Sequence, residues 1–104
     1  MVLISLFEFH EDFYGDLKKL SLILKKRVSS KIRDIKMNPR RFKHLSGPGN
    51  YYSARVGDLR IIYGIKENKV KFLMVEQRSK VYQNYYKRIS RVREALVHYG
   101  INNE

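Results

Sequence analysis

A two-residue connection, Gly57-Asp58, lies between two runs of alternating side chains, and it constrains the fold more than any other feature of the chain. A glycine in so short a connection between such runs is typical of a tight β-hairpin, which fixes the register of its two strands. The pairs expected to face each other are Val56 with Leu59, Arg55 with Arg60, Ala54 with Ile61, and Tyr52 with Tyr63. The sequence therefore predicts an antiparallel hairpin formed by residues 51–56 and 59–65.

Two amphipathic helices are expected before this hairpin. Their apolar faces are expected to contain Phe13, Leu17 and Leu20 in the first helix, and Leu24, Val28, Ile32 and Ile35 in the second. The outer side of the first helix is expected to carry Asp16 together with two lysines. Ser21 is suited to cap the second helix, and that helix should end near Asn38-Pro39, because proline restrains the residue before it.

Three further elements complete the predicted fold. Short β-forming runs predict a strand over residues 3–9 and another over residues 70–76, after a turn at Glu67-Asn68, and helical spacing predicts a last helix over residues 85–99. This order predicts an α+β fold with an N-terminal strand, a helical hairpin, a three-stranded antiparallel meander that joins the first strand in one sheet, and a C-terminal helix. At 104 residues, the whole chain 1–104 is expected to form a single domain.

The charge of the chain restricts the classes of molecule that it is expected to bind. It has 22 Lys and Arg against 10 Asp and Glu, a formal net charge of +12. Such a charge favours binding to nucleic acid, although a solvated basic surface or an acidic protein partner would also account for it. Residues 18–43 contain eleven of the basic residues and one acidic residue, Asp34; most of the lysines there are expected to form a solvated helix face, with long-range steering toward RNA.

Cysteine is absent, which excludes disulfides, thiolate metal sites and a cysteine nucleophile, and fits a reducing cytoplasm. The N-terminal apolar run is far shorter than a membrane span requires. The sequence also has no histidine pair at metal-binding spacing and no acidic cluster for divalent ions. We expect no metal, no cofactor and no contact with a membrane.

The predicted hairpin register gives the two sheet faces different chemistry. One face is expected to pack on the helices through Val56, Ala54, Tyr52, Leu59, Ile61 and Tyr63, extended by Val70, Phe72 and Met74 of the next strand. The other face presents Arg55 beside Arg60, and like charges opposite each other on neighbouring strands are destabilising. A phosphate would relieve the repulsion, since the guanidinium fork binds two phosphate oxygens; the alternative is two arginines that extend into solvent.

The run Val56-Gly57-Asp58-Leu59-Arg60-Ile61-Ile62-Tyr63, followed by Val75-Glu76-Gln77-Arg78-Ser79-Lys80-Val81-Tyr82, resembles the RelE family of toxins. The resemblance extends to the helical hairpin, to Asn38-Pro39-Arg40-Arg41 and to the loop Leu45-Ser46-Gly47. It implies a ribonuclease that enters the ribosomal A site, cleaves the messenger RNA held there, and is restrained by a cognate RelB-type antitoxin.

The resemblance also implies roles for individual residues. Arg60, Arg78 and Tyr82 match active-site positions of the family, whereas Arg55 and Ser53 stand where well-studied members have lysines. The expected catalytic residues are Arg60, Arg78, Tyr82 and Arg55, and the residues expected to contact RNA are Ser53, Lys71, Lys80, Arg40, Arg41 and Lys43. The absence of a lysine at Ser53 leaves the proton acceptor undefined.

The expected reaction uses the ribose 2′-hydroxyl of the RNA as nucleophile. Arg55 and Arg60 are assigned to the phosphate, Arg78 to the phosphate or the leaving oxygen, and Tyr82 to orientation or proton transfer. Other toxins of this kind use glutamate and histidine, but from the sequence Glu76 and the three histidines form no matching set. Two alternatives stay open: a ParE-type toxin that blocks DNA gyrase, and an RNA-binding module that does not cleave.

Overall fold

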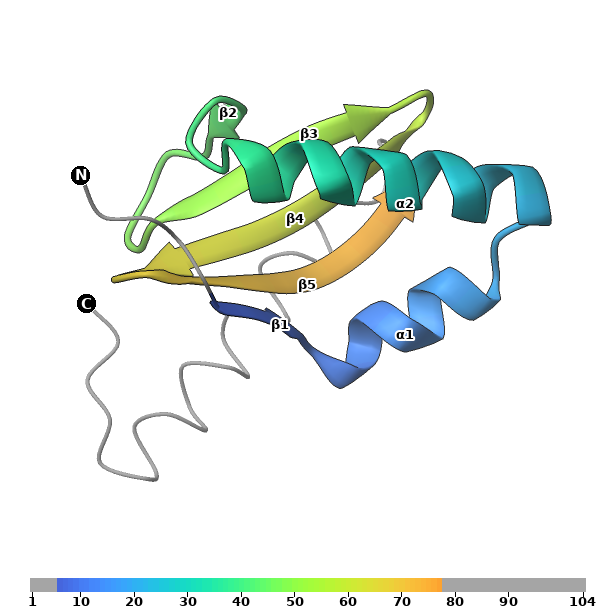
Figure 1. The fold of residues 1–104 in the computed structure, drawn as a ribbon, viewed down its shortest axis with the longest axis horizontal. Coiled ribbons are helices and arrows are strands. Elements are labelled where there is room, and N and C mark those ends of the chain that lie inside the picture. The colour runs from blue at the N-terminus through green and yellow to red at the C-terminus, as the bar shows by residue number, and fades with distance from the viewer. Residues whose placement is uncertain (1–5, 78–104) are drawn as a thin grey trace.

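The computed structural model describes residues 6–77, which fold into two helices and five strands (Figure 1). In chain order the elements are β1 (Leu6–Phe9), α1 (Glu11–Lys18), α2 (Leu22–Met37), β2 (Lys43–His44), β3 (Tyr51–Val56), β4 (Leu59–Lys66) and β5 (Lys69–Gln77). The strands form one mixed sheet in the order β1-β5-β4-β3-β2, in which β1 runs parallel to β5 and the other neighbours are antiparallel. The α+β prediction is confirmed, while residues 3–5 of the first predicted strand and the predicted helix 85–99 lie outside the described residues.

Local signals set the helix boundaries. The Nδ1 atom of His10 accepts a hydrogen bond from the Asp12 amide at 3.1 Å and so caps α1. The hydroxyl of Ser21 accepts from the Leu24 amide at 3.3 Å, as predicted for the start of α2. That helix ends at Met37, one residue before the predicted Asn38-Pro39 boundary.

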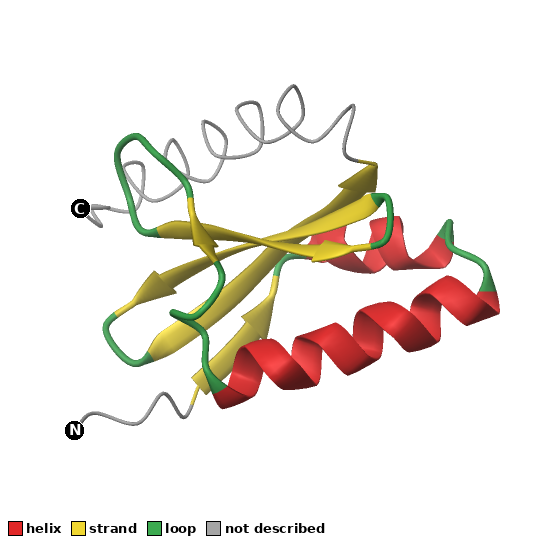
Figure 2. Cartoon of the chain, turned by 90° about the horizontal axis from the view of Figure 1, so that it is seen from above, coloured by secondary structure: helices red, strands yellow, loops and turns green. Residues whose placement is uncertain are grey.

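Both helices lie on the same face of the sheet, as Figure 2 shows. The main core forms between them and the sheet, and its buried residues include Phe13, Val28, Ile35, Tyr52, Ala54, Ile61, Tyr63, Val70 and Phe72. At its centre the Tyr63 hydroxyl donates a hydrogen bond of 2.5 Å to the carbonyl of Pro39. Burial raises the pKa of the Tyr63 phenol, and neighbouring Tyr52 raises it further. The hydroxyl therefore stays protonated and keeps its hydrogen bond from β4 to Pro39, which follows α2.

The predicted register of the first hairpin is confirmed at all four pairs. Val56 faces Leu59, and the pairs formed by Arg55 and Arg60, Ala54 and Ile61, and Tyr52 and Tyr63 follow. Gly57 adopts a positive φ of 58°, which a residue with a side chain rarely adopts and which a tight hairpin turn needs at this position.

The prediction for Met74 was wrong, because β5 contains a bulge. Ile62 pairs with Met74 but Tyr63 pairs with Phe72, so Leu73 is an extra residue and the alternation of β5 shifts by one beyond it. Val70 and Phe72 face the helices as expected. Met74 instead joins a second buried cluster, on the other face of the sheet, together with Leu45, Tyr51, Ile62 and Leu73.

The outward position predicted for Asp16 was also wrong. Asp16 is 7% exposed, and its Oδ2 atom accepts a hydrogen bond of 2.9 Å from the amide of Val75. The paired part of β1 ends at Phe9 opposite Phe72, so β5 continues beyond its neighbour, and α1 packs against it there. The Asp16 carboxylate therefore accepts the hydrogen bond of the Val75 amide at a place where β5 has no neighbouring strand on the β1 side.

The strand β2 was not predicted. It has two residues, Lys43 paired with Ser53 and His44 paired with Tyr52, and is too short to show a pattern in the sequence. The Nε2 atom of His44 lies 3.1 Å from Oδ1 of Asn50, which closes the glycine-rich loop between β2 and β3. The consequence for the site is that Lys43 comes to lie beside Ser53.

Candidate nucleic-acid interface

Arg55 and Arg60 lie opposite each other on β3 and β4, on the sheet face turned away from the helices. Arg55 is exposed, and its Nε atom donates a hydrogen bond of 2.9 Å to the carbonyl of Gly57. This bond fixes the guanidinium beside the hairpin turn. Residues 6–77 supply no acceptor to its two terminal nitrogens.

Arg60 is partly buried and held more firmly. One terminal nitrogen, Nη1, donates a hydrogen bond of 3.2 Å to the hydroxyl of Ser53, a side chain that is 3% exposed. The Nε atom of Arg60 is buried and has no hydrogen-bond partner within the described part of the chain. A buried donor on a cationic group is costly to leave unpaired, and the site therefore favours an acceptor at this point.

The short strand β2 adds a third cation to the same face. Lys43 pairs with Ser53, which in turn bonds Arg60, and the side chains of these residues share the face of Arg55. We call Lys43, Ser53, Arg55 and Arg60 the basic corner. Three cations and one hydroxyl within three neighbouring strands provide several donors that a phosphate group can accept from.

Glu76 is the residue that the sequence analysis set aside and the structure brings to the site. It lies on β5 directly opposite Arg60, so this arginine has a like charge on one side and an acidic neighbour on the other. Counting back from the turn at Glu67-Asn68 would pair Arg60 with Val75. The bulge at Leu73 shifts the pairing by one residue, and nothing in the sequence pattern indicates that shift.

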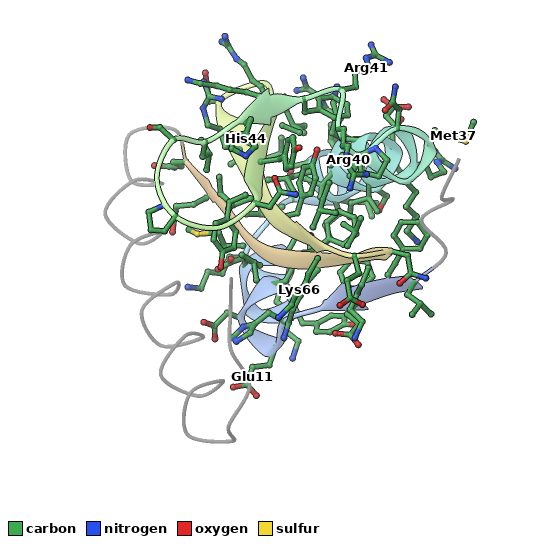
Figure 3. All side chains as sticks on the ribbon, turned by 90° about the vertical axis from the view of Figure 1, so that its left-hand side faces the viewer. Glu11, Met37, Arg40, Arg41, His44 and Lys66 are labelled. Atoms are coloured by element: carbon green, nitrogen blue, oxygen red, sulfur yellow. The ribbon has the colours of Figure 1, made fainter. Side chains whose placement is uncertain are left out.

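The other predicted contact residues lie at different places. Lys71 lies opposite Gly64, four residues from Arg60 along β4, or about 13 Å at the rise of a strand, and is not part of the basic corner. Arg40 and Arg41 are exposed on the segment that joins α2 to β2, next to Lys43 in the chain (Figure 3). The predicted residues Arg78, Lys80 and Tyr82 lie outside the described residues.

His44 lies away from the basic corner. His44 pairs with Tyr52, whose ring packs in the core on the helix side, and so lies on the opposite side of the sheet from Arg60. No three His, Asp or Glu side chains of this region are grouped to hold a metal ion. Neither helix of this region is long and apolar enough to cross a membrane.

A comparison with protein families gives a match over residues 7–82 to the ParE toxin of the type II toxin-antitoxin system parDE. The chain belongs to this family. It is thus a toxin of a type II toxin-antitoxin system, within the superfamily that unites the RelE and ParE toxins. No curated protein sequence matches this toxin.

Solved structures with the same fold include members from both branches of the superfamily. The RelB-RelE complex of Methanococcus jannaschii has 26% identity and a TM-score of 0.64, covering 75% of this chain and 98% of the other. The RelBE2 complex of Mycobacterium tuberculosis has 26% identity and a TM-score of 0.64, covering 74% and 94%. The chromosomal ParDE system of Pseudomonas aeruginosa has 8% identity and a TM-score of 0.62, covering 73% and 98%, and supports the fold alone.

Proposed function

We propose that this toxin is a ribosome-dependent endoribonuclease that cleaves messenger RNA in the A site and so inhibits translation. The observation that carries the proposal is the state of Arg60: its guanidinium is oriented by Ser53, its Nε atom is buried without a partner in residues 6–77, and Arg55 lies opposite it. A preorganised pair of guanidinium groups, of which Arg60 is partly buried, is suited to stabilise charge on a phosphate in the transition state.

The proposed reaction needs no external nucleophile. The ribose 2′-oxygen attacks the adjacent phosphorus and loses its proton, while the bond from phosphorus to the 5′-oxygen breaks and that oxygen gains a proton. Arg55 and Arg60 would neutralise the phosphate oxygens, and Lys43 would orient the backbone. Arg78 and Tyr82 keep the roles expected from the RelE resemblance, at the leaving oxygen and in orientation.

We assign proton acceptance to Glu76. The lysine that the resemblance would supply is replaced by Ser53, which is engaged in holding Arg60. Glu76 is the carboxylate placed directly opposite Arg60, so a phosphate bound by Arg60 would bring the adjacent ribose close to β5, and we propose that Glu76 accepts the proton of its 2′-hydroxyl.

A ParE-like inhibitor of DNA gyrase is the second candidate, because the family that matches residues 7–82 is described as ParE. The same cations would then contact a protein or DNA, and no cleavage would occur. A module that binds RNA without cutting it is a third candidate, favoured by the serine at position 53. Arg60, which matches the active-site arginine of the RelE family, and the positive charge that Arg55 keeps in place of a lysine support the endoribonuclease.

One experiment separates the three candidates. The purified toxin is incubated with translating ribosomes and a mapped message, and in parallel with gyrase and relaxed plasmid. We expect cleavage in the A-site codon, an upstream fragment that ends in a 2′,3′-cyclic or 3′-phosphate, a downstream 5′-hydroxyl, and survival of messages with a 2′-deoxy sugar at the cut position. A 5′-phosphate, cleavage beside a 2′-deoxy sugar, or gyrase inhibition without cleavage would each rule the proposal out.

We further propose a cognate antitoxin of the RelB type as the protein partner. Solved relatives from Methanococcus jannaschii and Mycobacterium tuberculosis are toxin-antitoxin complexes, and the charge of +12 suits a partner with an acidic segment. The messenger RNA and the ribosome would be its other partners.

A further inference from the structure

The outer side of α2 carries a stripe of hydrogen-bond donors. Lys26, Ser29, Arg33 and Lys36 follow one another at helical spacings of three and four residues, and all four are exposed. The helix rises 1.5 Å per residue, so the stripe extends about 15 Å from Lys26 to Lys36. We call these four residues the α2 stripe.

The charges of the α2 stripe are not neutralised within residues 6–77. Within residues 6–77, Lys26, Arg33 and Lys36 form no ion pair. The acidic residue of the helix, Asp34, lies on its other flank, with Arg27 and Lys31. The Lys36 ammonium lies 5.0 Å from the centre of the Phe7 ring, a contact that holds the cation at the surface without removing its charge.

The position of the stripe makes it independent of the basic corner. The helices cover one face of the sheet (Figure 2). Arg55 and Arg60 lie on the other face, because their neighbours in β3 and β4 point into the core beneath the helices. A molecule bound along α2 would therefore leave the basic corner accessible, and the toxin could hold two segments of nucleic acid at once.

We propose that the α2 stripe binds the phosphate backbone of double-helical RNA. Lysine, arginine and serine are the side chains that contact phosphates without reading sequence. The stripe contains no aromatic ring on which unpaired bases could stack, which argues against single-stranded RNA, whereas double-helical RNA is recognised through its shape and backbone. The choice of RNA over DNA is the one part of this inference that rests on the proposed function. A toxin that acts on the ribosome is surrounded by double-helical segments of ribosomal RNA.

The test compares two double variants of the same helix. K26Q/R33Q removes two charges from the stripe, and R27Q/K31Q removes two charges from the opposite flank; glutamine keeps the helix propensity in both. Binding of a blunt 16-base-pair RNA duplex, in the absence of ribosomes, is followed by fluorescence anisotropy at several salt concentrations, after circular dichroism has shown that both variants fold. We expect K26Q/R33Q to weaken binding by about tenfold or more and to reduce the salt slope by about 1.8, with little change in R27Q/K31Q.

Several results would overturn the inference. Equal losses in the two variants would mean that net charge binds the duplex and the stripe does not. Unchanged affinity of K26Q/R33Q for the RNA duplex would remove it, and so would tighter binding of the toxin to a DNA duplex of the same sequence. The inference would also fail if K26Q/R33Q lost affinity for an acidic protein partner but kept its affinity for the RNA duplex. Because no cleavage enters this assay, its failure leaves the proposed endoribonuclease untouched, and loss of cleavage leaves the stripe in place.

Discussion

At the scale of single residues, the guanidinium of Arg60 is the group on which the proposed site depends. Ser53 orients it, Arg55 lies opposite on one side and Glu76 on the other, and its Nε atom has no partner within residues 6–77. The hairpin turn alone predicted the pair of arginines. It could not predict that Ser53 would hold Arg60, because a hydrogen bond between neighbouring strands depends on the side-chain conformations that packing selects.

We predict that Arg60→Ala lowers cleavage by about 10²- to 10³-fold without unfolding the protein, as expected when a preorganised donor to the transition state is removed. Ser53→Ala should have a smaller effect in the same direction, because it loosens Arg60 but leaves the charge. Cleavage by ribosome-bound toxin is measured for both variants and for Lys66→Gln, a control on the exposed far end of β4. Near-normal cleavage by Arg60→Ala would remove the basic corner as the site.

The assignment of Glu76 makes a separate prediction. Glu76→Gln keeps the shape of the side chain but cannot accept the proton, so the cleavage rate should fall by about 10²-fold or more. The decline of the rate on the acidic side of the pH profile, which reports a catalytic base, should also disappear. A purely structural role would lower the rate at all pH values and leave the shape of the profile unchanged.

At the scale of helices and strands, prediction succeeded where a local signal was present and failed where tertiary contacts decided. Ser21 and Pro39 set the limits of α2, and Gly57 set the first hairpin. The bulge at Leu73 arises from packing on both faces of β5 and has no local signal. Asp16 was predicted to lie on the outer side of its helix because it is charged. Its spacing, three residues after Phe13 and four before Leu20, instead puts it on the helix face that packs on the sheet.

Asp16 therefore gives a prediction about stability. Asp16→Ala leaves the buried Val75 amide without its acceptor and should lower the free energy of unfolding by about 1 to 3 kcal/mol. Asp16→Asn keeps an oxygen in place and should lose less. Urea unfolding of both variants measures the difference, with Asp34→Ala, an exposed acidic residue of α2, as the control that should change little.

At the scale of the whole molecule, basic groups occupy both sides of the sheet. The basic corner lies on one face and the cations of α2 lie over the other, which accounts for much of the excess of Lys and Arg in the chain. Such a distribution repels itself and is relieved by polyanions or by an acidic partner. The net charge and the placement of the two arginines away from the helices were predicted from the sequence, whereas the position of Lys43 beside Ser53 became clear only from the fold.

The last prediction follows from that charge and concerns the partner. Expressed alone, the toxin should arrest bacterial growth, and co-expression of its cognate antitoxin should restore it. Because steering by opposite charges sets the rate of encounter, association of the purified pair should slow markedly as the salt concentration rises, while dissociation changes less. Stopped-flow mixing at low and high salt measures both rates. In the growth assay, Arg60→Ala should relieve the arrest, and so it separates toxicity from binding. Normal growth at high expression, in a bacterium that lacks any antitoxin, would contradict both the toxicity and the need for a partner.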